Sequence, residues 1–312
     1  MPYIISISDA SDEQLDGYRN LPERTLRGES IFLAEGDLLV TRLLQSRFRT
    51  RSILAVERFL SLIEVPIPDD VPVYVVSEET MRAVTGFGFY QGIMALGERE
   101  PIPKTATIID NPCFVNGSRE RNEVKRPDRT RDDPVTALCS VPGCHVHCDL
   151  DGAWVILPNA LKPDNLGLIF RSCAALGARG VILGEQCCDP FSRRALRVSM
   201  GGVLQVPIYK SDTLADDLVR LRDEAGFELC ATVLDDDAVS LYDCGNQGSG
   251  IATSNWAKRV GFVFGHEFSG LTDPWLSCCT KKIMIPIAPG VDSLNLGVSV
   301  GVFLYEYNRR GI

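Results

Sequence analysis

Histidine is scarce in this sequence, with only three among 312 residues. A metal site made of three imidazoles would need all of them, so we do not expect that class of site. Long apolar runs are missing as well, since no stretch reaches the roughly 20 residues that a membrane-spanning helix needs. We therefore expect no membrane partner.

Positive charge is not in excess, and the sequence starts without a basic leader. The 32 Lys and Arg against 41 Asp and Glu give a net charge of −9, which excludes a wholly basic nucleic-acid coat but leaves local basic patches open. The first residues, MPYIISISDASDEQ, lack the pattern of a secretory signal. The cysteine count is odd, at 11, and several Cys lie in apolar segments, as is typical of reduced thiols. We expect a cytoplasmic protein.

The remaining composition, 45% hydrophobic and 23% charged, is ordinary for a globular protein, and the length suits two domains. Residues 1–20 show no clear period, and we interpret them as an N-terminal extension. Residues 21–97 alternate between strand and helix patterns, which predicts a small α/β domain. We expect its strands at 30–34, 52–56, 73–76 and 91–96, and its helices at 36–45 and from Ser77 onward.

A break between domains follows at residues 98–152, which we interpret as a linker or insertion. Its segment CSVPGCHVHC, residues 139–148, holds five potential zinc ligands. Their spacing matches no common zinc signature, and an exposed polar loop is the alternative. We assign no metal ligands.

From residue 153 to residue 312 the pattern becomes a β-α-β series, which predicts a second α/β domain with a mostly parallel sheet covered on both faces. Its last strand is expected at 282–287, followed by a helix that starts near Ser293 and is apolar on nearly every face. Such a helix is normally buried. The other strands are expected at 154–157, 180–183, 206–209, 229–233 and 259–264, and the helices at 164–176, 192–201 and 212–225.

Three loops of this domain follow predicted strands and carry polar side chains. In the first, Asn165 lies in the first helical turn, and Gly167 leaves space beside Arg171 one turn on. Taken alone, Arg171 is better interpreted as an ordinary solvent-facing arginine on the side opposite the apolar face.

The second loop, GHEFSGL at residues 265–271, has two glycines that permit a tight turn around a ligand. Adjacent side chains such as His266 and Glu267 rarely converge on one ion, so we do not interpret them as a metal site. In the third loop Ser293 and Asn295 precede the last helix, where an N-cap is the simplest role for a serine.

Together and in this order, the three loops resemble the motifs of the SpoU (TrmH) family of RNA ribose 2′-O-methyltransferases, which belongs to the SPOUT superfamily. The resembling segments are DNLGLIFR at 164–171, GHEFSGL at 265–271, IPIAPGVDSLN at 285–295 and SRRALRVSMG at 192–201. The sequence departs from the family at His266, where Asn is usual, at Phe268, where Gly is usual, and at Gly297, where Ser is frequent. These departures affect the expected shape of the cofactor loop.

The resemblance implies an α/β fold with a mostly parallel sheet and a C-terminal deep trefoil knot, preceded by a small L30e-like substrate-binding domain. It implies S-adenosylmethionine as cofactor, RNA (tRNA or rRNA) as substrate, and a homodimer that shares its active site. By analogy, the cofactor-binding residues are Gly265, Glu267, Gly270, Leu271, Ile285, Ile287 and Leu294.

The implied reaction moves a methyl group from a sulfonium to a ribose 2′-hydroxyl. By resemblance, Arg171 acts on the hydroxyl, aided by Asn165, Ser293 and Asn295. A guanidinium stays protonated at neutral pH, so we expect Arg171 to hold the adjacent phosphate and orient the hydroxyl, not to act as base.

Next to such a domain, the arginines of the N-terminal half are better interpreted as phosphate contacts than as a solvated surface. The expected RNA-binding residues are Arg24, Arg27, Arg47, Arg49, Arg193 and Arg197. The alternative is a catalytically weak or inactive RNA-binding or ribosome-associated protein on the same scaffold.

Overall fold

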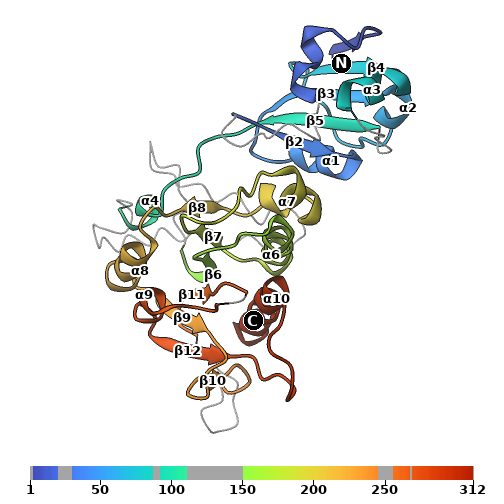
Figure 1. The fold of residues 1–312 in the computed structure, drawn as a ribbon. Coiled ribbons are helices and arrows are strands. Elements are labelled where there is room, and N and C mark those ends of the chain that lie inside the picture. Colours follow the sequence, from blue (N-terminus) through green and yellow to red (C-terminus); the bar gives the residue numbers. More distant parts are fainter. Residues whose placement is uncertain are drawn as a thin grey trace. The chain divides into compact units, whose positions relative to one another are not determined.

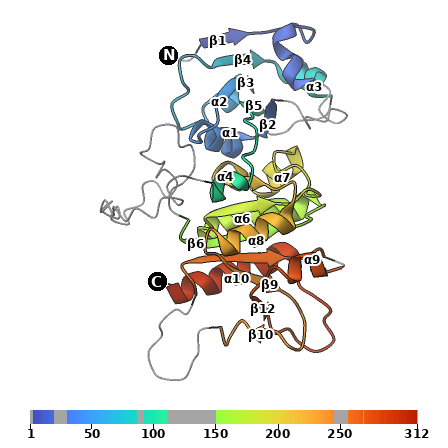
Figure 2. The ribbon, with the colours of Figure 1, turned by 90° about the vertical axis from the view of Figure 1, so that its left-hand side faces the viewer.

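The computed structural model describes residues 3–19, 30–86, 92–110, 150–244, 256–267 and 269–311. The chain divides into two compact units. The first unit is Met1–Pro101, Lys162–Arg171 and Cys188–Gln205, and the second is Ile102–Leu161, Ser172–Cys187 and Val206–Ile312. Figures 1 and 2 show the elements of both units from two directions. No helix in the described part of the chain is long and apolar enough to span a membrane.

The first unit is built on a five-stranded sheet. Its strands are β1 (Tyr3–Ser6), β2 (Ile31–Glu35), β3 (Thr50–Val56), β4 (Pro72–Val76) and β5 (Ile93–Glu98), in the order β1-β4-β3-β5-β2. Strand β5 is antiparallel to β2 and β3, whereas β4 is parallel to β1 and β3. These strands alternate with helices, as the sequence pattern predicted.

Successive side chains of these strands point to opposite faces of the sheet, as in any β-strand. Leu33, Leu54 and Met94 pack in one core with the helical turn η1 (Glu13–Tyr18) and with α3 (Glu78–Thr85). Helix α1 (Asp37–Leu44) contacts β2 and β5, and α2 (Glu57–Leu60) follows β3. Helix α3 starts where the sequence predicted, because the Ser77 side chain accepts a hydrogen bond from the Thr80 N–H.

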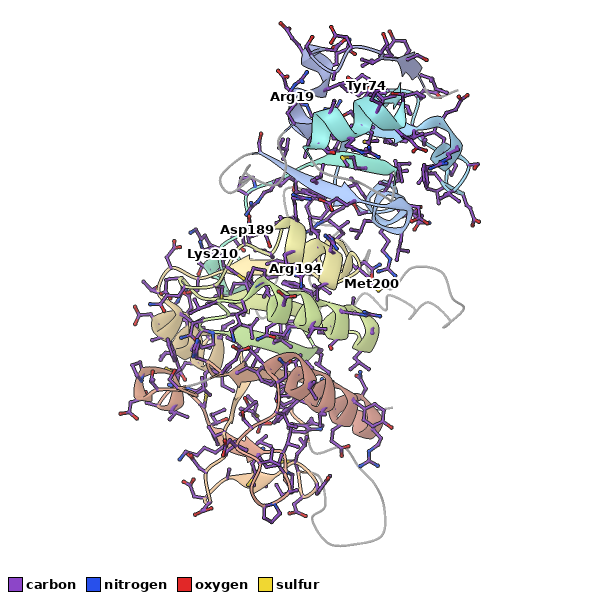
Figure 3. The ribbon with its side chains drawn as sticks, turned by 45° about the vertical axis from the view of Figure 1, so that its right-hand side comes forward. Arg19, Tyr74, Asp189, Arg194, Met200 and Lys210 are labelled. Atoms are coloured by element: carbon purple, nitrogen blue, oxygen red, sulfur yellow. The ribbon has the colours of Figure 1, made fainter. Side chains whose placement is uncertain are left out.

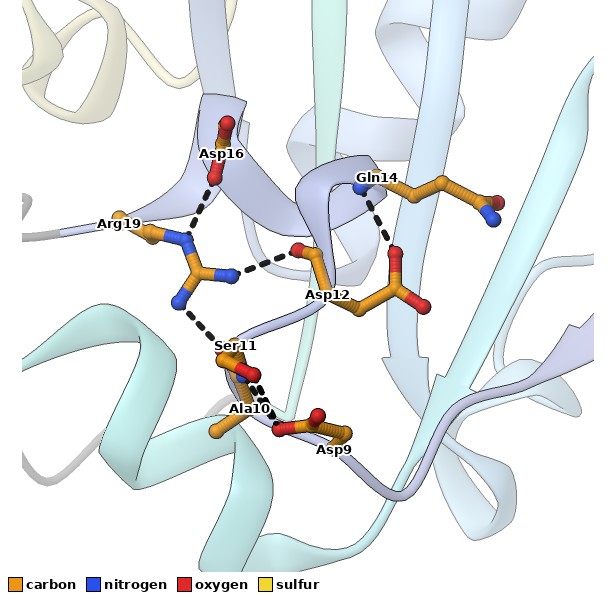
Figure 4. A network of polar contacts seen from close by, with 7 residues as sticks. All are labelled: Asp9, Ala10, Ser11, Asp12, Gln14, Asp16 and Arg19. Atoms are coloured by element: carbon orange, nitrogen blue, oxygen red, sulfur yellow. Dashed lines mark hydrogen bonds and ion pairs between the residues drawn. The ribbon is translucent and has the colours of Figure 1, made fainter.

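Residues 3–19, for which no element was expected, are part of this sheet. Strand β1 pairs with β4 at its edge, and the Tyr18 hydroxyl lies 2.7 Å from Ser52 Oγ inside the core. Figure 4 shows how Arg19 closes the segment: it donates to the carbonyl oxygens of Ala10 and Asp12 and pairs with Asp16 at 2.7 Å. Arg19 therefore has a structural role in this turn.

The same unit contains the start of α6 (Pro163–Leu176), the short helix α7 (Arg193–Val198) and the turn η2 (Gly202–Leu204). Phe191, just before α7, packs its ring 5.2 Å from Phe32 and 5.4 Å from Phe48. Through these rings the segment before α7 shares a core with β2.

The second unit is built on a seven-stranded sheet in which every pair is parallel. The order is β10-β12-β9-β11-β6-β7-β8. Its strands are β6 (Gly152–Leu157), β7 (Gly180–Leu183), β8 (Ile208–Lys210), β9 (Glu228–Thr232), β10 (Val239–Ser240), β11 (Arg259–Phe264) and β12 (Lys281–Met284). The predicted parallel sheet is confirmed.

Helices cover both faces of this sheet. Val263 lies in a core with α8 (Leu214–Asp223) and with α4 (Ala106–Ile109), an element that was not expected in the break between domains. The neighbouring Phe262 and Phe264 face the other way and pack on Phe303 of α10 (Leu296–Gly311), with ring centroids 5.2 and 5.5 Å apart. A last short helix, α9 (Asp273–Leu276), follows β11.

Two predictions for the C-terminal stretch are corrected. The strand ends at Met284, before Pro286, which has no N–H to give a ladder bond. Helix α10 starts at Leu296, and its cap is Asn295, not Ser293: the Asn295 Oδ1 accepts from the Gly297 N–H at 2.9 Å.

Helix α10 is also not buried on every side. Val298 is 50% and Tyr305 58% exposed, and Leu294 before it is 36% exposed. An apolar stripe on one exposed face of a helix is an unpartnered surface within the protomer.

The expected role of Gly167 is wrong in its detail. A Cβ built on Gly167 would lie 2.7 Å from Val198 Cβ and 2.9 Å from the Ala195 carbonyl oxygen, both in α7. Gly167 therefore lets α7 approach α6 closely and does not open space beside Arg171.

The substitution Gly167→Ala is expected to lower the free energy of unfolding by about 1–3 kcal/mol, because the methyl group meets a backbone oxygen that a rotamer change does not move. This loss outweighs the roughly 1 kcal/mol by which Ala exceeds Gly as a helix former. Urea unfolding monitored by circular dichroism measures it. Leu168→Ala, at the exposed next position, serves as the control and should change little; a more stable G167A would contradict the packing role.

Candidate functional site

Three strands of the second unit end at one edge of the same sheet. Strands β6, β11 and β12 are parallel, with β9 between β11 and β12, so the loops that leave them start at a common carboxyl edge. In open α/β sheets this edge is where ligands bind. The second and third motifs follow β11 and β12 directly, and the first follows β6 after a six-residue loop.

The loop after β11 is a tight turn closed by its own backbone. The His266 N–H donates to the Gly270 carbonyl at 3.0 Å, and the Gly270 N–H donates back at 2.9 Å. Gly265 admits no side chain, since a Cβ there would lie 2.2 Å from the Gly270 carbonyl carbon. Gly270 itself has φ 64°, which favours glycine.

This turn combines exposed backbone with a buried anchor. Leu271 is 9% exposed and belongs to the core beneath the sheet, whereas Glu267 is half-buried and Gly270 is exposed. A loop of this kind suits a ligand recognised mainly by main-chain groups. Phe268, one of the departures from the family, lies outside the described residues.

The loop after β12 offers apolar side chains and then polar ones. Ile285 and Ile287 are half-buried, and Ser293, Leu294 and Asn295 are exposed at the start of α10. Because Asn295 caps the helix, its side chain has a defined direction at the end where helix N–H groups are available.

The loop after β6 contains a polar atom that the sequence motifs do not include. Asn159 Oδ1 is buried and has no hydrogen-bond partner among the described residues. A buried acceptor of this type needs a donor from water or a ligand. In the sequence, Asn159 is distinguished only by its position two residues after β6, and ordinary loop residues often occupy such a position.

Cys187 holds that loop in place. Its Sγ accepts from the Ala160 N–H at 3.2 Å and lies 3.1 Å from the Leu157 carbonyl oxygen, to which it donates. Burial raises the pKa of Cys187 to about 11, so the thiol keeps the proton that it donates. The loop therefore has a fixed shape.

The residues of the first motif differ in burial. Asn165 is 7% exposed, whereas Arg171 is exposed and has no acidic partner in the described ranges. An arginine without a carboxylate on a helix surface is available for an anion.

Other arginines near this motif are paired with acids. Arg193 pairs with Glu35, whose side chain is 3% exposed, and Arg197 lies 4.0 Å from the same carboxylate. Arg194, marked in Figure 3, pairs with Asp164 at 2.6 Å, and its hydrogen bond lowers the pKa of that carboxyl.

The arginines expected to bind RNA in the N-terminal half also have partners. Arg49 lies 3.9 Å from Asp70 and 3.7 Å from Glu98, and the Arg47 guanidinium stacks 5.0 Å from the Phe48 ring centre. Arg24 and Arg27 lie outside the described residues, as does the Cys and His segment at 139–148. Within the described ranges, no group of three or more His, Cys, Asp or Glu is placed to hold a metal.

Comparison with known proteins places this geometry in a family. Residues 152–305 match the SpoU rRNA Methylase family. An uncharacterized tRNA/rRNA methyltransferase of Mycobacterium bovis is 29% identical over 311 residues, which is 98% of this chain and 92% of that protein. A 23S rRNA (guanosine-2′-O-)-methyltransferase of Acinetobacter baylyi is 24% identical over 256 residues, 81% of this chain and 85% of that protein.

The fold is shared over nearly the whole chain. The crystal structure of an AdoMet-bound rRNA methyltransferase from Sinorhizobium meliloti superimposes with a TM-score of 0.70 at 23% identity, covering 99% of each chain. The α/β fold with mostly parallel strands and the family resemblance predicted from the three motifs are thereby confirmed. Residues 152–305, just under half of the chain, thus match the SpoU rRNA methylase family, as the three motifs predicted.

Proposed function

We propose that this protein is an S-adenosylmethionine-dependent methyltransferase that acts on a ribose 2′-hydroxyl in tRNA or rRNA. The observation that carries the proposal is that the three family motifs follow, in order, three parallel strands whose carboxyl ends share one edge. A related enzyme of Acinetobacter baylyi acts on guanosine and one of Streptomyces viridochromogenes on uridine, both at the 2′-oxygen. The ribose hydroxyl, not the base, is what these targets share.

The residues at this edge fit S-adenosylmethionine. Gly265 and Gly270 place no side chain at the two ends of the turn, while Ile285, Ile287 and Leu294 supply apolar surface. Main-chain groups and aliphatic side chains suit a ligand with both an adenosine and an amino-acid part. The remaining residues assigned to the cofactor are Glu267 and Leu271.

When bound, the cofactor supplies an activated methyl group on a sulfonium, so the chain's own task is alignment and control of the hydroxyl proton. Arg171 holds the phosphate beside the target ribose and orients the 2′-hydroxyl. Asn165, Ser293 and Asn295 complete the catalytic set, and the cap bond of Asn295 limits its side-chain motion. A guanidinium is suited to the phosphate because it stays charged and donates in a fork.

The finer features of the fold are part of the proposal. A deep trefoil knot is supported by the path of the chain: β12 lies beyond β9, and α10 then returns to pack on β6 and β11. Residues 21–97 are proposed as an L30e-like RNA-binding domain preceded by the extension 1–20. Residues 98–152 are the insertion, and 153–312 the catalytic domain of a cytoplasmic enzyme.

A homodimer is supported by the exposed stripe of α10 and the turn before it. Leu294, Val298 and Tyr305 are spaced so that they follow one another along a helix face, and each is exposed in the single chain. A second copy of the chain would cover this stripe.

The direct test is transfer of a labelled methyl group from S-adenosylmethionine to bulk tRNA and bulk rRNA, followed by mapping of 2′-O-methyl sites. We expect the label on a ribose. A 2′-deoxy substitution at the same nucleotide should abolish labelling, because the reacting oxygen is then absent. Cofactor binding without any transfer would support the inactive scaffold instead. Label on a base would contradict the proposed reaction.

Arg171→Ala is expected to reduce transfer by about 100-fold while leaving S-adenosylmethionine affinity unchanged, because the hydroxyl is no longer positioned while the cofactor-binding residues stay intact. Single-turnover transfer and calorimetry measure the two effects. Arg222→Ala, which removes an arginine paired with Asp223 on α8, is the matched control. Undiminished transfer by R171A would remove Arg171 from its role.

The double substitution Val298→Glu and Tyr305→Glu is expected to convert a dimer into a monomer, because it places charge in the middle of the apolar stripe. Light scattering coupled to size exclusion gives the mass directly. Val219→Glu, at an exposed valine on α8, should leave the mass unchanged. A dimer that survives the double substitution would show that α10 is not the interface.

A further inference from the structure

We propose that Arg42 of helix α1 acts with Arg171 as a two-arginine clamp on one phosphate of the RNA backbone. Arg42 lies outside all the family motifs described above and was not among the expected RNA contacts. The inference rests on the proposed function, since it assigns a second substrate-positioning residue to the same reaction. It is carried by one turn of the first unit, Ser199–Gly202, which contacts both arginines.

On one side the turn contacts Arg42. The Arg42 Nη1 donates to the Met200 carbonyl oxygen, and a Cβ on Gly201 would lie 2.9 Å from Arg42 Cδ and 3.2 Å from Leu39 Cδ2. Figure 3 labels Met200, which lies in this turn just after α7. The guanidinium end of Arg42 is thereby fixed against the backbone of the turn.

On its other side the turn contacts α6 at Arg171. A Cβ on Gly202 would lie 2.7 Å from the Phe170 carbonyl oxygen and 3.2 Å from the Arg171 backbone nitrogen. Backbone therefore packs on backbone, and the position of Arg171 along α6 is tied to the turn that holds Arg42. Arg42 reaches this place from a helix 129 positions earlier in the sequence (171 − 42).

The two guanidinium groups are close enough to affect each other. Burial lowers the pKa of Arg42, and the positive charge of Arg171 lowers it further. Neither arginine has an acidic partner in the described part of the chain, whereas Arg193 and Arg194 each pair with a carboxylate. Two like charges held together without a counter-ion form a site that an anion stabilises.

Backbone strain in the turn agrees with a functional role. Met200 has φ 50°, the only positive value at a non-glycine residue in the described ranges. A non-glycine side chain is strained in that region, and such strain persists where surrounding contacts enforce it. The Arg42 hydrogen bond to the Met200 carbonyl is one of those contacts.

The chemistry of the pair selects the ligand. A phosphodiester presents two oxygens that guanidinium forks bind through charge-assisted hydrogen bonds, and RNA presents one at every nucleotide. The carboxylate of S-adenosylmethionine is the other anion in the proposed reaction. We assign the clamp to the RNA phosphate, and a test of cofactor affinity distinguishes the two.

The test measures binding of fluorescently labelled bulk tRNA and bulk rRNA by anisotropy at several salt concentrations, without requiring catalysis. Arg42→Gln is expected to weaken binding about tenfold and to reduce the slope of log affinity against log salt by about 0.7–1, the change expected when one positive charge is removed from the RNA backbone contact. Arg42→Lys keeps the charge, so the slope should stay near that of the wild type. Arg58→Gln removes an exposed arginine paired with Glu78 in the same unit and is the matched control.

The double variant R42Q/R171Q separates a shared phosphate from two independent phosphates. A shared phosphate predicts an affinity loss smaller than the product of the two single losses, because the second removal acts on an interaction that is already broken. The clamp would be overturned if the salt slope of RNA binding by R42Q equalled the slopes of the wild type and R58Q. It would also be overturned if the affinity loss of the double variant equalled the product of the two single losses. A loss of S-adenosylmethionine affinity in R42Q would assign the pair to the cofactor carboxylate and overturn it too.

Failure of the proposed function would look different. In that case the wild type would transfer no methyl group to a ribose, while the salt dependence of RNA binding by R42Q would still report on the clamp. Thermal unfolding of R42Q shows whether the turn at Met200 remains folded. A merely structural role for Arg42 would lower the melting temperature and leave the salt slope unchanged, which would contradict the clamp.

Discussion

The parallel pairing of β12 with β9, of β9 with β11 and of β11 with β6 is the constraint on which the rest of the second unit depends. Parallel strands point their carboxyl ends to one edge, so segments separated by more than a hundred residues begin from the same line. The turn of Gly265 to Leu271 and the loop before α10 therefore start at the same edge and need no long connections to lie there. Their rigidity comes from backbone bonds across the turn and from the cap at Asn295.

The arginines of the first unit differ in whether an acidic side chain lies beside them. The buried carboxylate of Glu35 attracts Arg193 and lies 4.0 Å from Arg197, while Asp164 holds Arg194. A buried carboxylate without such a partner would be costly, which explains why basic residues cluster there without necessarily contacting RNA. Arg42 and Arg171 differ because no acid accompanies them in the described ranges.

Continuous apolar segments were predicted well because strands of a parallel sheet are covered on both faces. The strands at 180–183 and 259–264 have the expected bounds, since continuous apolar runs are typical of parallel strands covered on both faces. Short elements at the edge of a sheet or over a loop were missed. Strand β1 and helix α4 have four residues each, too few to display a period, and they form only because distant partners pair or pack with them.

The sequence by itself determined the fold class, the family and the order of the three motifs, because these depend on residue types at fixed spacings along the chain. Only the tertiary structure decided that Asn295 caps α10, that Gly167 admits α7, and that one face of α10 is left exposed. It alone brought Arg42 to the turn beside Arg171. Such contacts join residues far apart in the chain. The local pattern of apolar and polar residues does not predict which distant segment will pack against a given glycine.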